Sequence, residues 1–327
     1  MHILVLGGTG LFGQATVRYL LEDAEISQVV SLDVTPPKET FLKSVEKFAG
    51  KFHFVRGDVS QIEDILKVMK QYAVDRLINW AFILGDAVNT DPRLAVRVNA
   101  LGMSNAFEAA RIMGVSRVIF ASSETVYGNQ SDYGDRDVTE DDRLYPSHSY
   151  ALCKRFAEIQ ADQYTGLYGM SFTGLRPTIG YGHGGRSPFI VKAFSDIVSL
   201  PAVGKPISFD IDGTDLFSLV YAEELARFSR MLVKAPSSPH PVYNIGGPPQ
   251  SLLDVAGAVR QYIPEARIAF GKEPMAGPGK GSLLPWKVSC ARAREDFGFS
   301  LKPLEEVVLM HINAARQEAG LEPLSRR

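Results

Sequence analysis

The sequence predicts an α/β protein built on a doubly wound parallel sheet, with a small C-terminal α/β lobe. Two observations carry this prediction. Short apolar runs alternate with segments of helical periodicity through residues 1–178. The first run, residues 3–6, breaks into a glycine cluster that leads into a helical pattern. Such strand–helix alternation is typical of a parallel sheet covered by helices on both faces.

The elements follow in order along the chain. Uninterrupted apolar runs predict buried strands at residues 3–6, 28–32, 52–55, 75–80, 117–121 and 171–175. Apolar residues at helical spacing predict helices at residues 11–22, 61–72, 92–113 and 149–166. Beyond residue 178 we expect a helix at 187–199, a strand at 216–220 that returns to the sheet, a helix at 222–233 and a strand at 242–245. The remaining lobe is expected to hold a helix at 251–262, a strand at 267–270, a surface loop or lid at 274–285 and a helix at 303–319.

Composition excludes several classes of function. Lysine and arginine total 35 against 37 acidic residues, a net charge of −2 that gives no basic surface for nucleic acid or anionic lipid. No apolar stretch approaches the ~20 residues that span a bilayer. The chain enters a strand within two residues of Met1, which leaves no room for a signal peptide. Cys153 and Cys290 make neither a disulfide framework nor a metal cluster. We therefore expect a cytoplasmic protein with no metal, nucleic-acid or membrane partner.

The glycine cluster has the spacing of a dinucleotide-binding turn. Gly7 would permit the tight turn, Gly10 would let a pyrophosphate approach the backbone, and Gly13 would let the helix pack on the strand. The helix that follows aims free N–H groups and its positive end at the phosphates. Asp33, twenty residues after Gly13, ends the second strand where a carboxylate accepts hydrogen bonds from an adenosine ribose. The other expected cofactor contacts in this turn are Thr9, Leu11 and Phe12.

The alternative is a glycine turn with no ligand, and the position of Asp33 argues against it. Asp33 also favours NAD over NADP, because a 2′-phosphate would meet a like charge and neither Val34 nor Thr35 supplies a cation. Residues 1–178, with 216–246 returning to them, are thus expected to form a Rossmann-type dinucleotide-binding domain. Residues 179–215 and 247–327 would form the substrate-binding lobe.

Three polar residues predict the chemistry. Ser123 follows the fifth strand, whose carboxyl end faces the cofactor crevice. Tyr150 and Lys154 open a helix at i, i+4 spacing, which puts the phenol and the ammonium on one face. Lowering a phenol pKa from ~10 to about 7 needs ~4 kcal/mol of phenolate stabilisation, which a nearby ammonium and an oxidised nicotinamide could supply. Tyr150 would then take a proton from a substrate hydroxyl that Ser123 positions. The alternative is a Tyr and a Lys on an ordinary solvated helix.

On these residues the sequence resembles the extended short-chain dehydrogenases/reductases, also called the NAD-dependent epimerase/dehydratase family. The resemblance spans nearly the whole chain. It rests on residues 7–13, Asp33, residues 57–59, Asn99, Ser122-Ser123, residues 126–128, Tyr150 with Lys154, residues 175–177 and Tyr181-Gly182.

The resemblance implies a role for each matched residue. Tyr150 and Lys154 would be the catalytic pair, Ser123 the third member, and Lys154 would also bind the nicotinamide ribose. Asp58 and Val59 would border the adenine. The remaining cofactor and scaffold positions would be Ala81 at the cofactor backbone, Asn99 in the active-site scaffold and Pro177 beside the nicotinamide. The family commonly dimerises through the two helices that correspond to 92–113 and 149–166, so we expect a homodimer.

Several positions depart from the nucleotide-sugar enzymes that this family contains. Those relatives grip the substrate diphosphate with an Asn, an Arg and a further Arg. Here Ile179 and Phe217 occupy the first two positions, and the third is matched at best by residues 279–282 with Lys280. One lysine is a poor substitute for bidentate arginine contacts. We therefore expect a smaller or less anionic alcohol or ketone as the substrate.

Five residues are candidates for substrate contact. Ile83 lies in an apolar stretch after the fourth strand that would wall the pocket, unless it is core. Dehydratases of the family follow the catalytic hydroxyl with an Asp-Glu pair, but Glu124 and Thr125 stand here, so a dehydratase is not expected. Glu124 is either a proton relay or the cap of a turn. Thr178 follows the sixth strand, and Arg186 in the glycine-rich loop either meets an anionic group or lies on the surface.

The leading hypothesis is an NAD-dependent oxidoreductase acting at a secondary alcohol or ketone of a sugar, sugar acid or other small polyol-like substrate. The first alternative is a sugar epimerase, possibly for nucleotide sugars, that holds NAD tightly. The second is a non-catalytic NAD-binding protein, against which the intact Ser123, Tyr150 and Lys154 argue.

Overall fold

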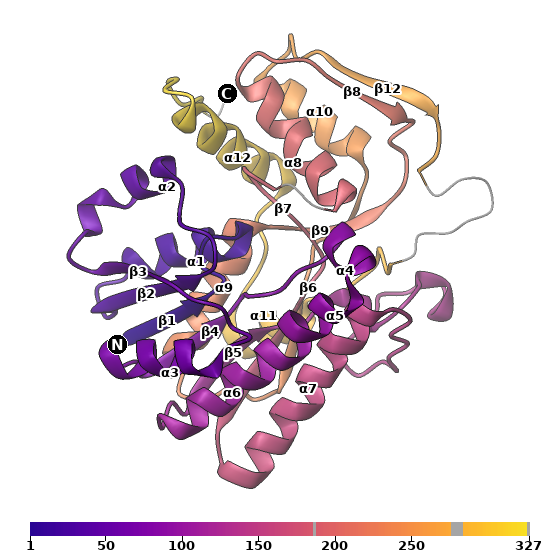
Figure 1. Cartoon of the computed structure of the whole chain (residues 1–327). Coiled ribbons are helices and arrows are strands. Elements are labelled where there is room, and N and C mark those ends of the chain that lie inside the picture. The colour runs from indigo at the N-terminus through magenta and orange to yellow at the C-terminus, as the bar shows by residue number, and fades with distance from the viewer. Residues whose placement is uncertain (186–187, 276–283, 326–327) are drawn as a thin grey trace.

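The centre of the molecule is a seven-stranded parallel sheet in the order β10-β6-β5-β4-β1-β2-β3 (Figure 1). The computed structural model describes residues 1–185, 188–275 and 284–325. The strands of the sheet are β1 (His2–Leu6), β2 (Gln28–Asp33), β3 (Phe52–Arg56), β4 (Arg76–Asn79), β5 (Arg117–Ala121), β6 (Ser171–Pro177) and β10 (Val242–Ile245). Every neighbouring pair in it runs parallel. The α/β fold class expected from the sequence is confirmed.

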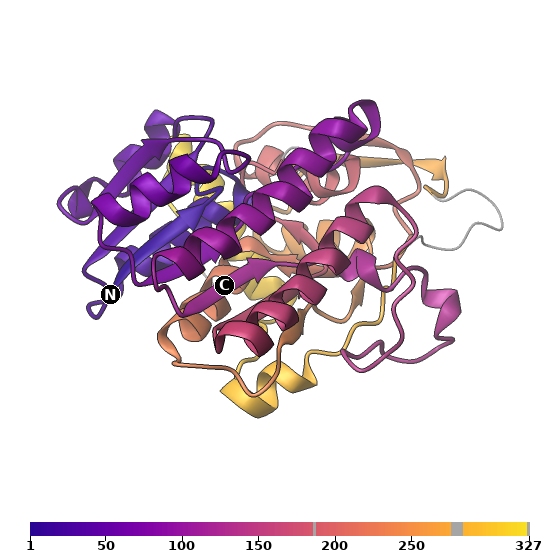
Figure 2. The same cartoon turned by 60° about the horizontal axis from the view of Figure 1, so that its bottom comes forward.

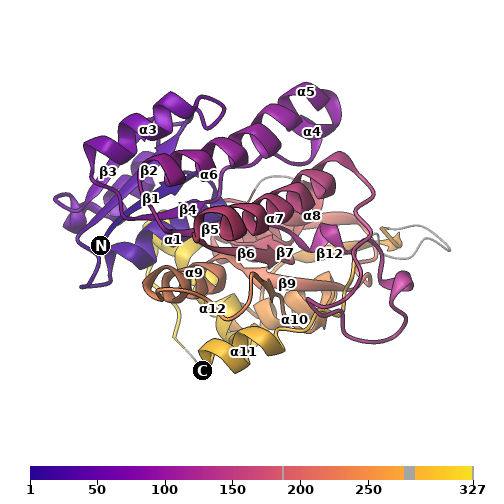
Figure 3. The same ribbon diagram turned by 90° about the horizontal axis from the view of Figure 1, so that it is seen from below.

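Helices cover both faces of this sheet (Figure 3). Successive residues of β1 point to opposite sides: Ile3 belongs to one buried cluster and Leu4 to the other. The first cluster is closed by α1 (Leu11–Leu21), α2 (Glu39–Ser44), α9 (Ala222–Lys234) and α11 (Ala291–Phe297). The second is closed by α3 (Ile62–Gln71), α6 (Gly102–Ile112) and α7 (Ser149–Tyr168). Both faces of the strands are therefore apolar, as the continuous hydrophobic runs predict. None of the described helices is long and apolar enough to cross a membrane.

A smaller lobe sits over the carboxyl end of the sheet (Figure 1). Its elements are α8 (Phe189–Ala202), α10 (Leu252–Tyr262), α12 (Leu304–Glu318), the three-stranded sheet of β7 (Ile179–Tyr181), β9 (Phe217–Tyr221) and β11 (Pro249–Gln250), and the parallel pair β8 (Ile207–Ile211) and β12 (Ile268–Glu273). One apolar cluster joins the three helices to both small sheets. The segment expected as a surface loop or lid, 274–285, falls largely outside the described residues.

The expectation that residues 216–220 return to the central sheet is wrong. This segment is a strand, β9, but it pairs with β7 and β11. The place beside β6 is taken by β10, in the register Val242↔Gly174. Both β9 and β10 are short apolar runs, so the local pattern does not decide which of them reaches the edge. Because β7 follows β6 directly and leaves the sheet, it offers β9 an alternative edge.

The helix expected at 92–113 is divided. Two short helices, α4 (Asp86–Thr90) and α5 (Pro92–Ala95), lead into a π-helical segment, Val96–Leu101, before α6 begins. Asn99 lies in this π-helical segment. Wider turns of this kind are rare and are frequent at functional sites. Apolar periodicity located the helix but could not reveal the widened turn.

In Figure 2 the two long helices α6 and α7 lie next to each other along one face of the sheet. Sequence patterns missed α2, α11, β7, β8 and β11, all of them seven residues or fewer. The helix expected at 187–199 extends to Ala202, and Pro201 lies inside its last turn. The helices at 251–262 and 303–319 and the strand at 267–270 are found, with shifted ends.

Candidate active site

The glycine turn after β1 is built for close packing on one side and is open on the other. Gly7 has φ +73°, and a Cβ there would lie 2.6 Å from the Ala81 nitrogen. At Gly13 an added Cβ would lie 2.1 Å from the Gly7 carbonyl oxygen. At Gly10 it would meet only that same oxygen, at 3.4 Å. Gly7 and Gly13 are therefore demanded by the fold, whereas Gly10 leaves open space at the start of α1, as a phosphate cradle requires.

Asp33 ends β2 beside this turn. Its two carboxylate oxygens accept hydrogen bonds from the Thr9 amide (3.2 Å) and the Thr35 amide (3.1 Å). The side chain is half-buried, and Thr9 and Leu11 in the turn are half-buried as well. The carboxylate is thus fixed at the edge of the turn, where a ribose hydroxyl can still reach it. Val34 and Thr35 beside it are exposed and uncharged.

The segment after β3 closes the neighbouring side of the crevice. Asp58 accepts a hydrogen bond from the Ser60 amide (2.8 Å), and its own amide donates to Asp64 (2.9 Å). Val59 is buried against Gly102 of α6, where an added Cβ would lie 2.7 Å from a Val59 methyl group. The loop after β3 is therefore locked, with Val59 as an apolar wall.

Asn99 holds the segment that follows β4. Its side-chain oxygen accepts from the Ile83 amide (2.8 Å) and its side-chain nitrogen donates to the Ile83 carbonyl (2.8 Å). Ala81 is held in the same way by Asn79 (2.9 Å). Between these two anchors lies Phe82. The backbone of residues 81–83 is thus fixed by two buried amide side chains, and Asn99 acts on it as a scaffold.

The structure brings Ser123, Tyr150 and Lys154 together. Ser123 begins the turn after β5 and forms a side-chain hydrogen bond with Tyr150. The Lys154 Nζ lies 5.3 Å from the centre of the Tyr150 ring and 4.3 Å from that of Phe82. The rings of Phe82 and Tyr150 meet edge to face, 6.0 Å apart. The i, i+4 spacing on α7 therefore delivers both side chains to one point, as expected.

In the ligand-free chain, burial dominates the electrostatics of these groups. Burial raises the pKa of the Tyr150 phenol, and the hydrogen bond with Ser123 only partly opposes this. Burial also lowers the pKa of Lys154 to about 7. Its Nζ is fully buried and donates to the Ala121 carbonyl (2.8 Å) rather than to the phenol. The Lys154 ammonium alone therefore does not lower the pKa of the Tyr150 phenol in the ligand-free chain. A further positive charge beside the phenol is needed to lower it.

A buried ion-pair network lies beneath these residues. Glu158, one turn after Lys154, accepts from Arg176 (2.7 and 2.9 Å), Ser122 (2.5 Å) and Arg155 (3.0 Å). Burial alone would raise the pKa of Glu158, but these donors outweigh it and hold the pKa below its usual value. Because Ser122 precedes Ser123 and Arg176 precedes Pro177, one carboxylate ties α7, β5 and β6 together. Glu158 was not predicted from the sequence. The only feature that could have indicated it is its position four residues after Lys154, which places it on the same face of α7.

Glu158→Gln is expected to lower the free energy of unfolding by about 3–5 kcal/mol, because it leaves the buried Arg176 uncompensated. Urea unfolding at pH 7 measures this. Glu39→Gln is the matched control: Glu39 pairs with Lys43 on an exposed helix face, and its loss should change nothing measurable. A carboxylate with a depressed pKa stabilises above its unfolded-state pKa, and the gain is lost as pH falls through the folded-state pKa. The difference between wild type and Glu158→Gln should therefore shrink in acid. An unchanged midpoint at pH 7 would contradict this account.

The other expected substrate contacts lie around the same point. Thr178 is buried and bonds to the Ile245 carbonyl, and Pro177, also buried, ends β6. Thr125 is half-buried, and Glu124 is almost fully buried. Arg186 lies outside the described residues, as do residues 279–282 with Lys280.

Two histidines have structural roles. His148 accepts from the Ala151 amide (3.4 Å) as the N-cap of α7, and its exposed ring stacks on Tyr150. His183 bonds to Ser199 (3.1 Å) and Glu318 (3.0 Å), which joins α8 and α12. Among the described residues, no group of three or more His, Cys, Asp or Glu side chains could hold a metal ion.

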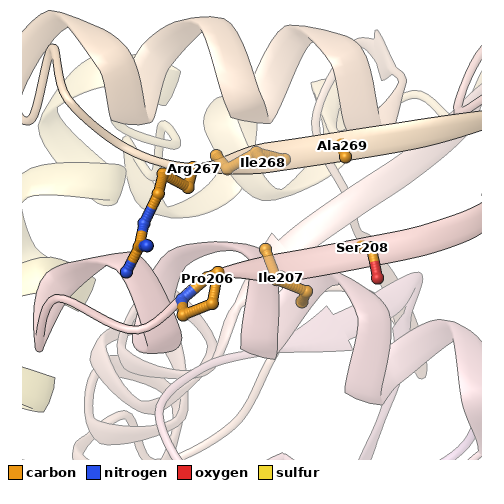
Figure 4. Close-up of a pocket in the computed structure, with 6 residues that line it drawn as sticks. All are labelled: Pro206, Ile207, Ser208, Arg267, Ile268 and Ala269. Carbon is orange, nitrogen blue, oxygen red and sulfur yellow. The ribbon is translucent and has the colours of Figure 1, made fainter.

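One hollow of the described surface is separate from this site. It has a volume of about 310 Å³ and lies between the starts of β8 and β12, lined by Pro206, Ile207, Ser208, Arg267, Ile268 and Ala269 (Figure 4). It contains none of the residues at the carboxyl end of the central sheet.

A glycine turn, a carboxylate fixed beside it and a Ser–Tyr–Lys constellation on a doubly wound sheet are typical of a dinucleotide-dependent enzyme of the short-chain dehydrogenase/reductase class. A sequence model of the NAD-dependent epimerase/dehydratase family matches residues 3–246. The chain belongs to this family, and its cofactor is NAD. The open cradle at Gly10 and the fixed carboxylate of Asp33 fit that cofactor.

Similar proteins fall on both sides of the dehydrogenase–epimerase division. An uncharacterized protein from Methanocaldococcus jannaschii is 29% identical over 212 residues, 61% of this chain and 62% of that protein. UDP-glucose 4-epimerase from Mycolicibacterium smegmatis is 27% identical over 310 residues, 91% of this chain and 93% of that protein. The solved structure of a GalE-like L-threonine dehydrogenase from Cupriavidus necator has a TM-score of 0.80 at 20% identity, covering 95% of this chain and 99% of that one. This last likeness concerns the fold.

Proposed function

We propose that this chain is an NAD-dependent oxidoreductase that acts at a secondary alcohol or ketone of a sugar, a sugar acid or another small polyol-like substrate. The observation that carries the proposal is the convergence of Ser123, Tyr150 and Lys154 at the carboxyl end of the sheet, next to the glycine turn. Ligands of open α/β sheets bind at this end.

In this proposal Tyr150 is the general base that takes the proton of the substrate hydroxyl. Ser123, which already hydrogen-bonds to the phenol, would hold the same oxygen in place. Bound NAD supplies the hydride acceptor and the additional positive charge beside the phenol. Lys154, kept on the shared face of α7 by the Ala121 carbonyl, would bind the ribose of the nicotinamide half and add its own charge.

The cofactor would lie along the edge already described. Residues 7–13 would hold the pyrophosphate, Asp33 the adenosine ribose, and Asp58 and Val59 the adenine. Ala81, Pro177 and the Asn99 scaffold would border the nicotinamide half. Binding of NAD to wild type, measured by calorimetry, tests the assignment together with the glycine variants discussed below.

Two buried positions support a substrate smaller than a nucleotide sugar. Ile179 pairs with Leu219 between β7 and β9, and Phe217 packs edge to face on Phe194. Both are at least nine-tenths buried in the apolar core of the lobe, so neither faces a ligand. Adding UDP-hexoses during a thermal melt tests this part of the proposal. We expect no shift in Tm, and a clear stabilisation at micromolar ligand would reject it.

The competing function is a sugar epimerase that holds NAD tightly, and the similarity to UDP-glucose 4-epimerase favours it. A screen of sugars, aldonic and uronic acids and hydroxy-ketones against NAD⁺ and NADH separates the two. NADH that appears at 340 nm in proportion to substrate consumed means a dehydrogenase. Inversion of a stereocentre with no net NADH means an epimerase.

The exposed face of α7 supports a homodimer. Leu152, Phe156, Ile159 and Leu167 follow one another at helical spacing and are 44–73% exposed. A stripe of this kind on a long helix is usually covered by a partner. Light scattering coupled to size exclusion would show the dimer, and Phe156→Glu should convert it to a monomer.

A further inference from the structure

Two polar groups in the turn after Ser123 have no hydrogen-bond partner. Glu124 is 2% exposed, and its Oε2 is sealed from solvent without a partner. The Thr125 Oγ1 is sealed and unpartnered in the same way. No described side chain or backbone group hydrogen-bonds to the Glu124 carboxyl. Both residues belong to the single 3-10 turn Glu124–Val126, whose N-cap is Ser123.

This turn lies directly beside the reacting groups. Ser123 hydrogen-bonds to the Tyr150 phenol, and Glu124 in its ionised form would raise the pKa of that phenol, after the larger effect of burial. The Glu124 carboxyl is therefore within electrostatic reach of Tyr150. Cys153 is the other group whose charge raises the pKa of this phenol.

An unpaired buried carboxyl is costly. Nearly all buried polar groups in folded proteins are hydrogen-bonded, and those that are not call for a specific explanation. Burial raises the pKa of Glu124 well above its usual value, which favours the protonated form, and a protonated carboxyl can donate a hydrogen bond. Glu224 of α9 is as buried, and its Oε1 is also sealed without a partner, but its Oε2 accepts from Arg227 and from the Lys302 amide (both 3.0 Å). Among the described residues, the Glu124 Oε2 accepts no hydrogen bond of this kind.

We propose that the Glu124 carboxyl donates a hydrogen bond to an oxygen on the carbon next to the reacting carbon, and that Thr125 supports it. This rests on the proposed function. It narrows the substrate class to secondary alcohols, or the matching ketones, that carry an oxygen substituent on the adjacent carbon. The hydrogen bond is made without proton transfer and without loss of a leaving group. Violations of local packing rules gather at functional sites because a ligand satisfies them.

The first experiment reads stability alone. In the ligand-free protein Glu124→Leu removes an unsatisfied group, so its Tm should rise by about 2 °C or more. Glu224→Leu, the matched control, removes a carboxylate oxygen that accepts hydrogen bonds from Arg227 and the Lys302 amide, so its Tm should fall. If Glu124→Leu instead lowers the Tm, the carboxyl has a structural partner and the inference is overturned.

The second experiment measures how strongly the enzyme prefers a substrate with an oxygen on the adjacent carbon. Wild type, Glu124→Gln, Glu124→Leu and Glu224→Leu are given NAD⁺ with butane-2,3-diol or with butan-2-ol, and NADH is followed at 340 nm. The ratio of kcat/KM for the diol over the mono-alcohol should be at least tenfold in wild type. Glu124→Gln keeps a donor and should retain this ratio, Glu124→Leu should lose it, and Glu224→Leu should not change it. A ratio that survives in Glu124→Leu overturns the inference.

The two experiments also separate this inference from the proposed function. If wild type forms no NADH from either alcohol, oxidation of secondary alcohols fails for these probes. The Glu124 assignment is then decided by the melts, where a rise in Tm supports it and a fall rejects it.

Discussion

Tyr150→Phe is expected to lower kcat for alcohol oxidation by about 10²–10⁴-fold, the usual contribution of a positioned acid or base. The substitution removes only the phenol oxygen. The ring that packs on Phe82 remains, so the fold and NAD binding should be unchanged. Steady-state rates at 340 nm, with calorimetry for NAD, check this. The non-catalytic alternative predicts that no measurable activity changes in this variant.

The pH dependence of the same pair follows from the direction of its pKa. Burial raises the pKa of Tyr150, so the reactive phenolate is the minor form and its fraction grows tenfold per pH unit. Between pH 5 and 6, at least one unit below the value of about 7 to which burial lowers the pKa of Lys154, that lysine stays charged. The wild-type rate of oxidation should therefore rise with pH in this window. The residual rate of Tyr150→Phe should be flat, and a parallel slope in both proteins would assign the base to another group.

The second large effect is expected from the glycine turn, where two similar substitutions should act on different quantities: one on the free energy of unfolding, the other on the affinity for NAD. Gly13→Ala places a Cβ 2.1 Å from the Gly7 carbonyl oxygen, so strand and helix must separate. We expect a loss of about 2–3 kcal/mol or more in the free energy of unfolding. Gly10→Ala places its Cβ 3.4 Å from the same oxygen and near nothing else, so stability should change by no more than about 0.5 kcal/mol.

Gly10→Ala should nevertheless weaken NAD binding at least tenfold, about 1.4 kcal/mol, because the new methyl group fills the space that a pyrophosphate needs. Urea unfolding measures the first quantity for both variants, and calorimetric titration with NAD measures the second. Normal NAD affinity in a folded Gly10→Ala protein would show that the phosphates do not lie over this turn. Equal destabilisation by both substitutions would show that the open space at Gly10 is not present in solution.

Much of the site was predictable because its residues belong to local patterns. The Gly7-to-Gly13 spacing, the distance to Asp33 and the i, i+4 step from Tyr150 to Lys154 each specify geometry within one or two adjacent elements. Parallel strands then bring these elements to the same edge of the sheet. The alternation of strands and helices predicted the sheet for the same reason, since each element buries its own apolar face.

Tertiary contacts decided the rest. The pairing of β9 with β7, the buried carboxylate of Glu158 and the unpartnered carboxyl of Glu124 all depend on residues distant in sequence. The shifts in the pKa values of Tyr150 and Lys154 could not be predicted from the sequence either, because desolvation depends on everything packed around a group.

By itself the sequence determined the fold class, the cofactor and the residues that converge at the carboxyl end of the sheet, because short-range spacing and periodicity encode them. Only the tertiary structure decided which strand completes the sheet, which charges are paired and which polar groups lack a partner, because burial and hydrogen-bond satisfaction are properties of the assembled chain.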